Sequence, residues 1–277
     1  MFFIEILKAI AQGIVQGITE WLPVSSTGHI LLLDAAWPML GGAEFFDVFK
    51  VIIQLGSIMA VVVLYFHKLN PFSPKKSAVE KKGTWVLWSK VLVASIPAAI
   101  AGLALDDLID GVLSTPVVIA AALIVYGVAF IIMESRNHST KVETVEDISY
   151  KHAFGIGAFQ MLALIPGTSR SGSTILGASL LGTSRTAAAE FSFFMAIPVM
   201  LGASGLKVVK YFLLDNYTFT MWQWIILATA TVVSFVVSLL VIRGLMAFIK
   251  KHSFAPFGWY RIALGAVVLG CVAMGWL

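Results

Sequence analysis

Two short polar segments interrupt a chain that is otherwise apolar, and both carry side chains that can bind and cleave phosphate groups. The run 16–29 holds a carboxylate, an imidazole and three consecutive hydroxyls. The run 166–174 holds a guanidinium among serines, threonines and glycines. An ionisable side chain deep in an apolar region costs several kcal/mol unless it is paired, hydrated or used for function. The sequence therefore predicts a polar site inside a membrane protein.

The polar residues of the first helix recur every three or four positions and so share one face: Glu5, Lys8, Gln12, Gln16 and Glu20. Gln16 and Glu20 lie one turn apart at the end of this face, just before Pro23. Glu20 is therefore expected to point at the break and to act in catalysis. Gln16 cannot ionise and is expected to bind substrate. The alternative for Glu20 is a helix-terminal carboxylate bonded only to backbone or to Arg170.

The hydroxyls Ser25, Ser26 and Thr27 follow the proline, and one of them is expected to cap the next helix. A helix N-terminus also offers free N–H groups and a partial positive charge to an anion. Gly28 and His29 fall in the first turn of that helix. We predict that Ser26 and His29 are catalytic and that the others bind substrate. A purely structural histidine is the alternative.

Arg170 is the costliest residue of the chain, because apolar runs flank its segment on both sides. Its guanidinium fork suits a phosphate group, so we predict that it holds an anionic substrate. A structural ion pair with Glu20 is the alternative. The neighbouring hydroxyls and a glycine that permits close backbone approach are expected to bind the same group: Ser169, Ser171, Gly172 and Thr174.

If the two breaks meet at mid-membrane, they form one pocket that contains both a carboxylate and a guanidinium. Glu20, with a serine hydroxyl and substrate oxygens, is the candidate ligand for a divalent cation, Mg²⁺ or Ca²⁺, since both prefer oxygen. The chain contains no Walker-type Gly-x-x-x-x-Gly-Lys-Ser loop and no Cys/His spacing typical of zinc.

The composition is that of a membrane protein. Of 277 residues, 59% are hydrophobic and 12% are charged, whereas a soluble domain carries about 25% charged residues. The net charge of +4 does not indicate a nucleic-acid partner, because no basic run is interleaved with exposed aromatics. A span needs about 20 apolar residues, and six runs approach or exceed this length: 47–66, 85–105, 116–134, 187–213, 221–246 and 256–277.

Lysine and arginine gather in alternate loops, at 67–84, 135–152 and 243–252. The intervening loops contain no Lys or Arg, and their acidic residues include Asp107, Asp110 and Asp215. Because basic loops stay in the cytoplasm, we expect the six spans to end with the C-terminus outside.

Segments 1–42 and 153–183 fall outside the six spans, and each contains a proline-bearing break between two helical stretches. Under this topology each segment must begin and end on one side of the membrane, so we predict two re-entrant hairpins. Non-helical backbone at that depth occurs only where it is buried in protein or lines a water-filled cavity. The predicted fold is an all-α integral membrane protein with six transmembrane helices and two re-entrant helix-break-helix hairpins.

The two halves of the chain resemble each other. Gln160 lies 144 residues after Gln16, and both precede a proline and a Ser/Gly-rich stretch. We therefore predict one membrane domain, 1–277, built of repeat one, 1–134, and repeat two, 153–277. Each repeat is a hairpin plus three spans, and the odd number makes the topology inverted. Coincidence among apolar segments is the alternative.

With these motifs in view, the chain resembles the undecaprenyl-diphosphatase family, bacterial membrane enzymes associated with bacitracin resistance. The resemblance covers nearly the whole chain, and the joint order of its motifs is specific. They are Gln16-x-x-x-Glu20, Pro23-Val24-Ser25-Ser26-Thr27-Gly28-His29, Val51-Ile52-Ile53-Gln54-Leu55-Gly56, Pro166-Gly167-Thr168-Ser169-Arg170-Ser171-Gly172 and Glu190-Phe191-Ser192-Phe193.

The resemblance implies a hydrolase that converts undecaprenyl diphosphate to undecaprenyl phosphate and inorganic phosphate, and so recycles the lipid carrier of cell-wall precursors. It implies a multi-pass protein of the bacterial cytoplasmic membrane. Because the first hairpin begins and ends on the side opposite the lysine-rich loops, we expect the site to face the extracytoplasmic side. The nucleophile stays open among Ser26, His29 and water, and a homodimer is the candidate assembly. The competing class is a transporter or flippase of polyprenyl phosphate, since broken helices in inverted repeats are also a transporter design.

Overall fold

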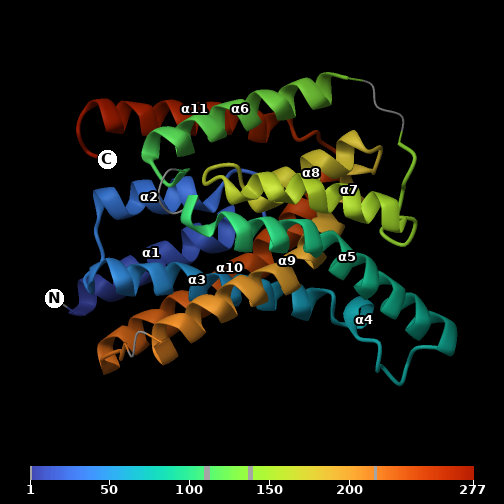
Figure 1. Ribbon diagram of the computed structural model, residues 1–277, viewed down its shortest axis with the longest axis horizontal. Coiled ribbons are helices and arrows are strands. Elements are labelled where there is room, and N and C mark those ends of the chain that lie inside the picture. Colours follow the sequence, from blue (N-terminus) through green and yellow to red (C-terminus); the bar gives the residue numbers. More distant parts are fainter. Residues whose placement is uncertain (1, 109–112, 137–139, 215–216) are drawn as a thin grey trace.

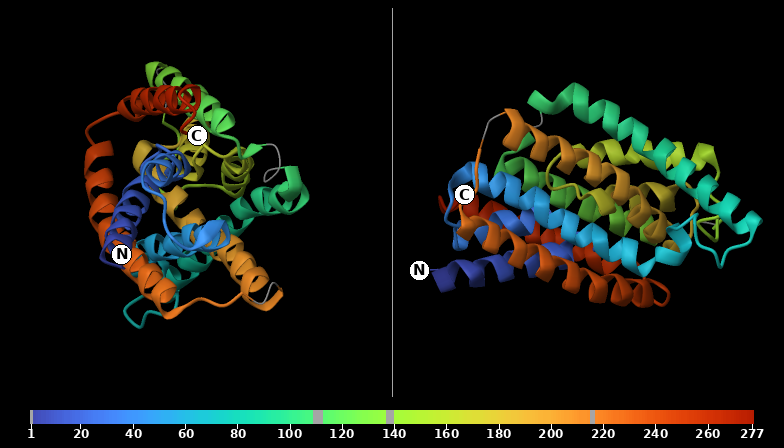
Figure 2. Two further views of the ribbon diagram at one scale, coloured as in Figure 1. Left: turned by 90° about the vertical axis from the view of Figure 1, so that its left-hand side faces the viewer. Right: turned by 90° about the horizontal axis from the view of Figure 1, so that it is seen from below.

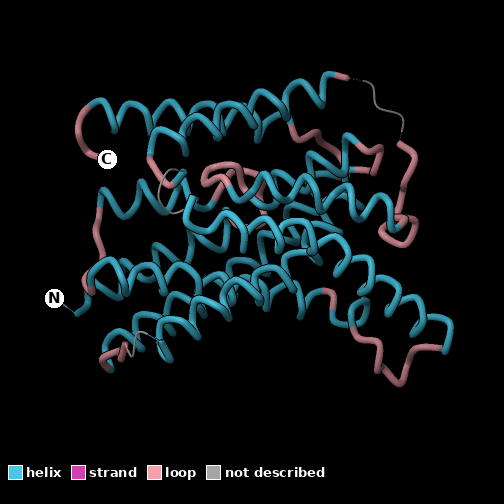
Figure 3. The backbone as a smooth tube through the Cα atoms, in the orientation of Figure 1, coloured by secondary structure: helices cyan, strands magenta, loops and turns pink. Residues whose placement is uncertain are grey.

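The computed structural model describes residues 2–108, 113–136, 140–214 and 217–277, and this part of the chain is folded almost wholly into helices (Figure 1; Figure 3). Six of its helices are long and apolar enough to cross a membrane, as predicted. They are α3 (Gly42–Leu64), α5 (Ala78–Leu108), α6 (Pro116–Ser135), α9 (Arg185–Val209), α10 (Met221–Ile249) and α11 (Ala255–Ala273). Asp110 and Asp215, used for the topology prediction, lie outside the described residues.

The starts of several helices follow directly from local sequence. Thr115 accepts a hydrogen bond from the N–H of Val118 and is followed by Pro116, whose fixed φ suits a first helical position. Thr220 and Gln223 form a reciprocal capping box at the start of α10. Each cap satisfies N–H groups that lipid cannot, so the spans begin at defined residues.

The remaining helices form two helix-break-helix units and short connecting turns. The first unit is α1 (Phe2–Thr19) and α2 (Ser26–Ala36), and the second is α7 (Tyr150–Gln160), the 3₁₀ turn η2 (Met161–Leu164) and α8 (Arg170–Leu180). The turns α4 (Phe66–Leu69) and η3 (Lys210–Leu214) complete the described helices. The breaks at 20–25 and 165–169 therefore fall at the polar segments identified from the sequence.

The two units lie between α6 with α11 on one side and α3 with α10 on the other (Figure 1; Figure 2). Buried residues follow one another through α8 from Ser171 to Ala178, so this short helix is enclosed on all sides. A helix whose residues are buried all round cannot lie on the membrane surface. The polar breaks are thus held inside the helical bundle.

Each unit begins and ends at one place. The N–H of Leu40, after α2, donates to Glu5 Oε2 in α1 at 2.9 Å, and the Lys8 ammonium donates to the carbonyl of Pro38. In the second unit the N–H of Lys141, before α7, donates to the carbonyl of Gly182, after α8, at 2.8 Å.

Glycines bring two pairs of helices into close contact, α1 with α10 and α6 with α11. A Cβ at Gly17 would lie 2.8 Å from the carbonyl oxygen of Ser234, so α1 packs directly against the backbone of α10. A Cβ at Gly127 would lie 2.7 Å from the carbonyl oxygen of Gly258, which joins α6 to α11 in the same way. Close packing of this kind holds helices together where the surrounding lipid offers no hydrophobic drive.

Candidate active site

The two breaks share one backbone conformation at their ends. Ser25, before α2, has φ 72°, and Ser169, before α8, has φ 74°. They are the described non-glycine residues with positive φ, a conformation that costs about 1–3 kcal/mol and concentrates at functional sites. Ser25 Oγ accepts from the N–H of Gly28 at 3.5 Å, and Ser169 Oγ accepts from the N–H of Gly172 at 3.1 Å. Both serines therefore act as helix caps at equivalent positions.

Hydrogen bonds join the break of the first unit to the start of α8, at the break of the second. Ser171 Oγ lies within hydrogen-bond distance of the carbonyl of Glu20, at 3.0 Å, and of Leu22, at 3.2 Å. It also lies 3.2 Å from Ser169 Oγ. The N-termini of α2 and α8 are consequently held beside the end of α1.

Glu20 is the centre of a buried polar cluster. Its carboxylate is 5% exposed, and Oε1 accepts from Arg170 Nη2 at 3.3 Å. Its other oxygen, Oε2, accepts from Gln16 Nε2 at 3.0 Å and from Ser26 Oγ at 3.4 Å. Three other residues chosen from the sequence, Gln16, Ser26 and Arg170, are therefore brought together around the carboxylate of Glu20.

The guanidinium of Arg170 is held by backbone and side chain but keeps donor capacity. Nη1 donates to the carbonyl of Ser192 at 2.7 Å and lies 3.3 Å from Ser192 Oγ, which Thr174 Oγ1 contacts at 2.6 Å. The group lies 5.8 Å from the ring centre of Trp21. Arg170 Nε is buried with no hydrogen-bond partner. A donor left unpaired in a dry interior is costly, so Nε is available to a water or a ligand that accepts from it.

His29 is fixed by bonds to both ring nitrogens. Nδ1 lies 2.7 Å from the carbonyl oxygen of Ser25, so Nδ1 carries the proton and Nε2 is the acceptor in the neutral ring. Nε2 lies 2.7 Å from the hydroxyl of Tyr260, which stacks on the imidazole with ring centres 5.5 Å apart. Both residues lie in the part of the chain that the structure describes, and no hydrogen bond joins His29 to Glu20. The two predicted catalytic groups thus face different partners, while Thr27 is exposed and Gly28 is buried.

Arg261 on α11 was not identified from the sequence. Its side chain is 0% exposed, and its Nη atoms donate to Pro23 O at 3.1 Å, to Gly167 O at 3.0 Å and to Thr168 O at 2.8 Å. It therefore ties the first break to the second. The cost argument that singled out Arg170 applies equally to a guanidinium in the last apolar run, and would have found it.

The oxygen atoms around Glu20 suit a hard divalent cation that substrate oxygens complete. Gln16 Oε1 is buried with no partner, and the nitrogen of the same amide donates to Glu20. Within the described ranges, no group of three or more His, Cys, Asp or Glu side chains converges. One carboxylate and one amide oxygen fit an ion that takes its other ligands from phosphate and water, as Mg²⁺ does.

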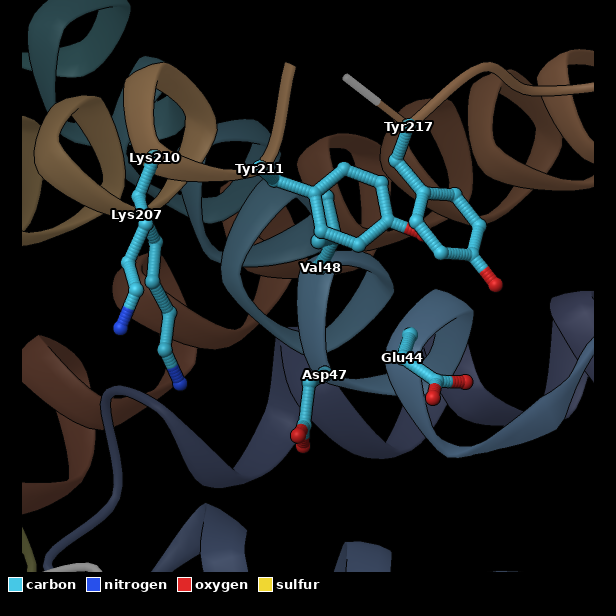
Figure 4. A pocket seen from close by; sticks show the side chains of 7 residues that line it. All are labelled: Glu44, Asp47, Val48, Lys207, Lys210, Tyr211 and Tyr217. Atoms are coloured by element: carbon cyan, nitrogen blue, oxygen red, sulfur yellow. The ribbon is translucent and has the colours of Figure 1, made fainter. Parts of the chain in front are cut away.

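Of two cavities in the described part of the structure, one borders the site and the other lies away from it. One of about 610 Å³ is bordered by His29 and Tyr260 and is otherwise mainly apolar. The other, of about 390 Å³, lies between the start of α3 and the end of α9, and Figure 4 shows its charged side chains, among them Asp47, Lys207 and Lys210. None of the residues predicted from the sequence to form the site lines this second cavity.

Comparison with known proteins agrees with the motifs. The family model described as bacitracin resistance protein BacA matches residues 9–267. A protein of Enterococcus faecalis named undecaprenyl-diphosphatase is 56% identical over 272 residues, which cover 98% of each chain. A protein of the same name from Lactiplantibacillus plantarum is 55% identical over 269 residues, covering 96% of this chain and 98% of the relative. Undecaprenyl-diphosphatase 1 of Clostridioides difficile is 54% identical over 266 residues, covering 96% of each. The chain belongs to the bacitracin resistance protein BacA family.

Proposed function

We propose that the protein hydrolyses undecaprenyl diphosphate to undecaprenyl phosphate and inorganic phosphate, the activity named for its relatives. The observation that carries this proposal is the Arg170–Glu20 cluster at two converging helix N-termini. Arginine donors, free N–H groups and hydroxyls are the groups that bind a diphosphate. The product is the lipid carrier that cell-wall synthesis reuses.

Each residue of the cluster has a distinct role in this proposal. Arg170 holds the diphosphate with its Nε and Nη groups, and stabilises the charge that builds on the transferring phosphoryl group. Ser26 Oγ attacks the terminal phosphorus while Glu20, which already accepts from it, takes its proton. The P–O bond to undecaprenyl phosphate breaks, and water later releases phosphate from the serine. His29 Nε2 is the base placed to activate that water once it leaves Tyr260.

A divalent cation, Mg²⁺ or Ca²⁺, belongs to the proposal. Glu20 and Gln16 Oε1 would hold it together with substrate oxygens. When bound, such an ion neutralises charge on the phosphates.

The proposed membrane arrangement has two re-entrant hairpins in inverted repeats, with the site open to the extracytoplasmic side of the bacterial cytoplasmic membrane. The meeting ends of each unit and the matching caps Ser25 and Ser169 support it. Labelling of intact cells with an impermeant thiol reagent tests the sidedness in a Cys271→Ser background. We expect Asp107→Cys to react and Lys76→Cys to be protected; the reverse pattern overturns it. The homodimer stays a prediction.

Phosphate release by purified protein from a long-chain prenyl diphosphate, without any gradient, tests the activity. We expect release that chelator suppresses and added Mg²⁺ or Ca²⁺ restores. Arg170→Ala should abolish it and Arg170→Lys should impair it severely, because a point charge cannot reproduce the fork. The control is Arg185→Lys, which alters an ion pair with Glu134 away from the site. Movement of polyprenyl phosphate across vesicles without phosphate release would favour the flippase instead.

A further inference from the structure

The apolar cavity of about 610 Å³ begins at the active site and continues along the membrane-spanning helices. Its polar lining is confined to Thr19, His29 and Tyr260, and the rest is apolar, including Phe248 and Phe257. Gly244 and Tyr260 are exposed at its edge, and both lie within membrane-spanning helices. The cavity is therefore a groove open to lipid rather than an enclosed void.

The groove and the site share residues. Thr19 is the neighbour of Glu20, and His29 belongs to the helix whose N-terminus faces the cluster. Tyr260 stands at the junction, since its hydroxyl bonds His29 Nε2 while its ring lines the groove. The groove therefore starts one residue from Glu20 on α1 and in the first turn of α2.

The course of the groove fits a lipid whose head group enters from outside. It passes from the break to Phe248 and Pro256, at the connection between α10 and α11. Lys250 and Lys251 in that connection mark the cytoplasmic end under the proposed topology. A lipid of the outer leaflet points its chain in this direction.

We propose that this groove binds the part of the substrate's prenyl chain that adjoins the diphosphate, so that one lipid is held by its head at Glu20 and Arg170 and by its chain between α10 and α11. This inference rests on the proposed function. A volume of about 610 Å³ is within the range of ligand sites, roughly 300–1,000 Å³, and holds only the first isoprene units of a long chain. The remainder of the chain lies in the bilayer.

Gly244 gives a direct test, because a Cβ there meets no atom within 4 Å. Gly244→Leu fills the groove without a backbone clash, and leucine is the better helix former. Gly202→Leu on α9 is the matched control, since its Cβ also meets nothing within 4 Å. Turnover of undecaprenyl diphosphate is compared with that of dimethylallyl diphosphate, which carries a single isoprene unit.

We expect Gly244→Leu to lower kcat/KM for the long substrate roughly tenfold or more, through KM, and to lower it far less for the single-unit substrate, which fills only the start of the groove. Gly202→Leu should match wild type on both. Equal activity of both variants on the long substrate overturns the groove while leaving the proposed hydrolysis intact. Absence of phosphate release by the wild-type protein instead overturns the proposed function.

A second measurement does not depend on turnover. p-Benzoylphenylalanine in place of Phe248 should crosslink the prenyl diphosphate in preference to an excess of phospholipid. The control position is Phe154, which is 53% exposed on α7 and should capture bulk phospholipid. Capture of phospholipid alone at both positions would show that the groove takes membrane lipid and not the substrate.

Discussion

Replacing Arg261 by methionine should loosen the joint between the two breaks. Methionine keeps most of the side-chain volume but removes the donors to Pro23, Gly167 and Thr168, at 3.1, 3.0 and 2.8 Å. Hydrogen bonds to charged groups contribute about 1.5–3 kcal/mol in soluble proteins, and bonds between membrane helices about 0.6–2. At about 1 kcal/mol for each of three bonds, the free energy of unfolding should fall by about 3 kcal/mol.

Turnover should fall as well, by a barrier increase of similar size to the loss of folding stability. The carbonyls that Arg261 binds belong to the two loops that lead into the helices of Ser26 and Arg170, the residues proposed to act on the substrate. A displacement of about 1 Å at a reacting centre costs on the order of 100-fold in rate. We therefore expect a kcat roughly 100-fold lower at temperatures where the variant is fully folded. Arg261→Lys should recover part of both losses, because an ammonium can reach some of the same carbonyls.

The assay combines thermal unfolding in detergent with phosphate release measured well below the unfolding temperature. A loss of about 3 kcal/mol corresponds to a shift of roughly 5–12 °C for a chain of this size. Arg243→Met, an exposed arginine on α10, is the control for loss of charge. If Arg261→Met unfolds and turns over like this control, the guanidinium does not hold the breaks together.

Three further outcomes follow from the site and its surroundings. Glu20→Gln should abolish metal-dependent turnover, whereas Gln16→Glu should stay active. Both are measured as phosphate release with and without chelator. Near-normal activity of Glu20→Gln would mean that Glu20 is only a structural cap. Tyr260→Phe should lower kcat/KM by no more than about tenfold and shift the pH profile of kcat/KM. The reason is that one hydrogen bond of about 1 kcal/mol is lost while the carbonyl of Ser25 still holds His29. An unchanged pH profile contradicts the proposed role of His29 Nε2 as a base. Burial alone would raise the pKa of Glu146, but the bond from Lys68 at 2.9 Å holds it below its ordinary value of 4.5. The stabilisation is therefore present above that value and lost as pH falls below it, and Lys68→Met should flatten this part of the thermal-stability profile.

The apolar lengths, the loop charges and the polar breaks were readable from the chain because each is a local property. A run of about 20 apolar residues crosses a bilayer whatever its neighbours are, so the six spans were predicted with small shifts at their ends. The serine caps and the cost of Arg170 are local in the same sense. The family followed from motifs in order, and the matching family model covers residues 9–267.

Pairing between distant polar groups was decided only by the packing of helices. Glu20 and Arg170 are 150 residues apart, and His29 and Tyr260 are 231 apart. The sequence offered a metal ion with a serine hydroxyl, or an ion pair with Arg170, as partners for Glu20, and the fold places the hydroxyl of Ser26 and the guanidinium of Arg170 there. Arg261 and the groove at Gly244 depend on how α10 and α11 lie against α1 and the breaks. A side chain's own spacing sets which helix face it occupies, but the identity of its partner is set by which other helix covers that face.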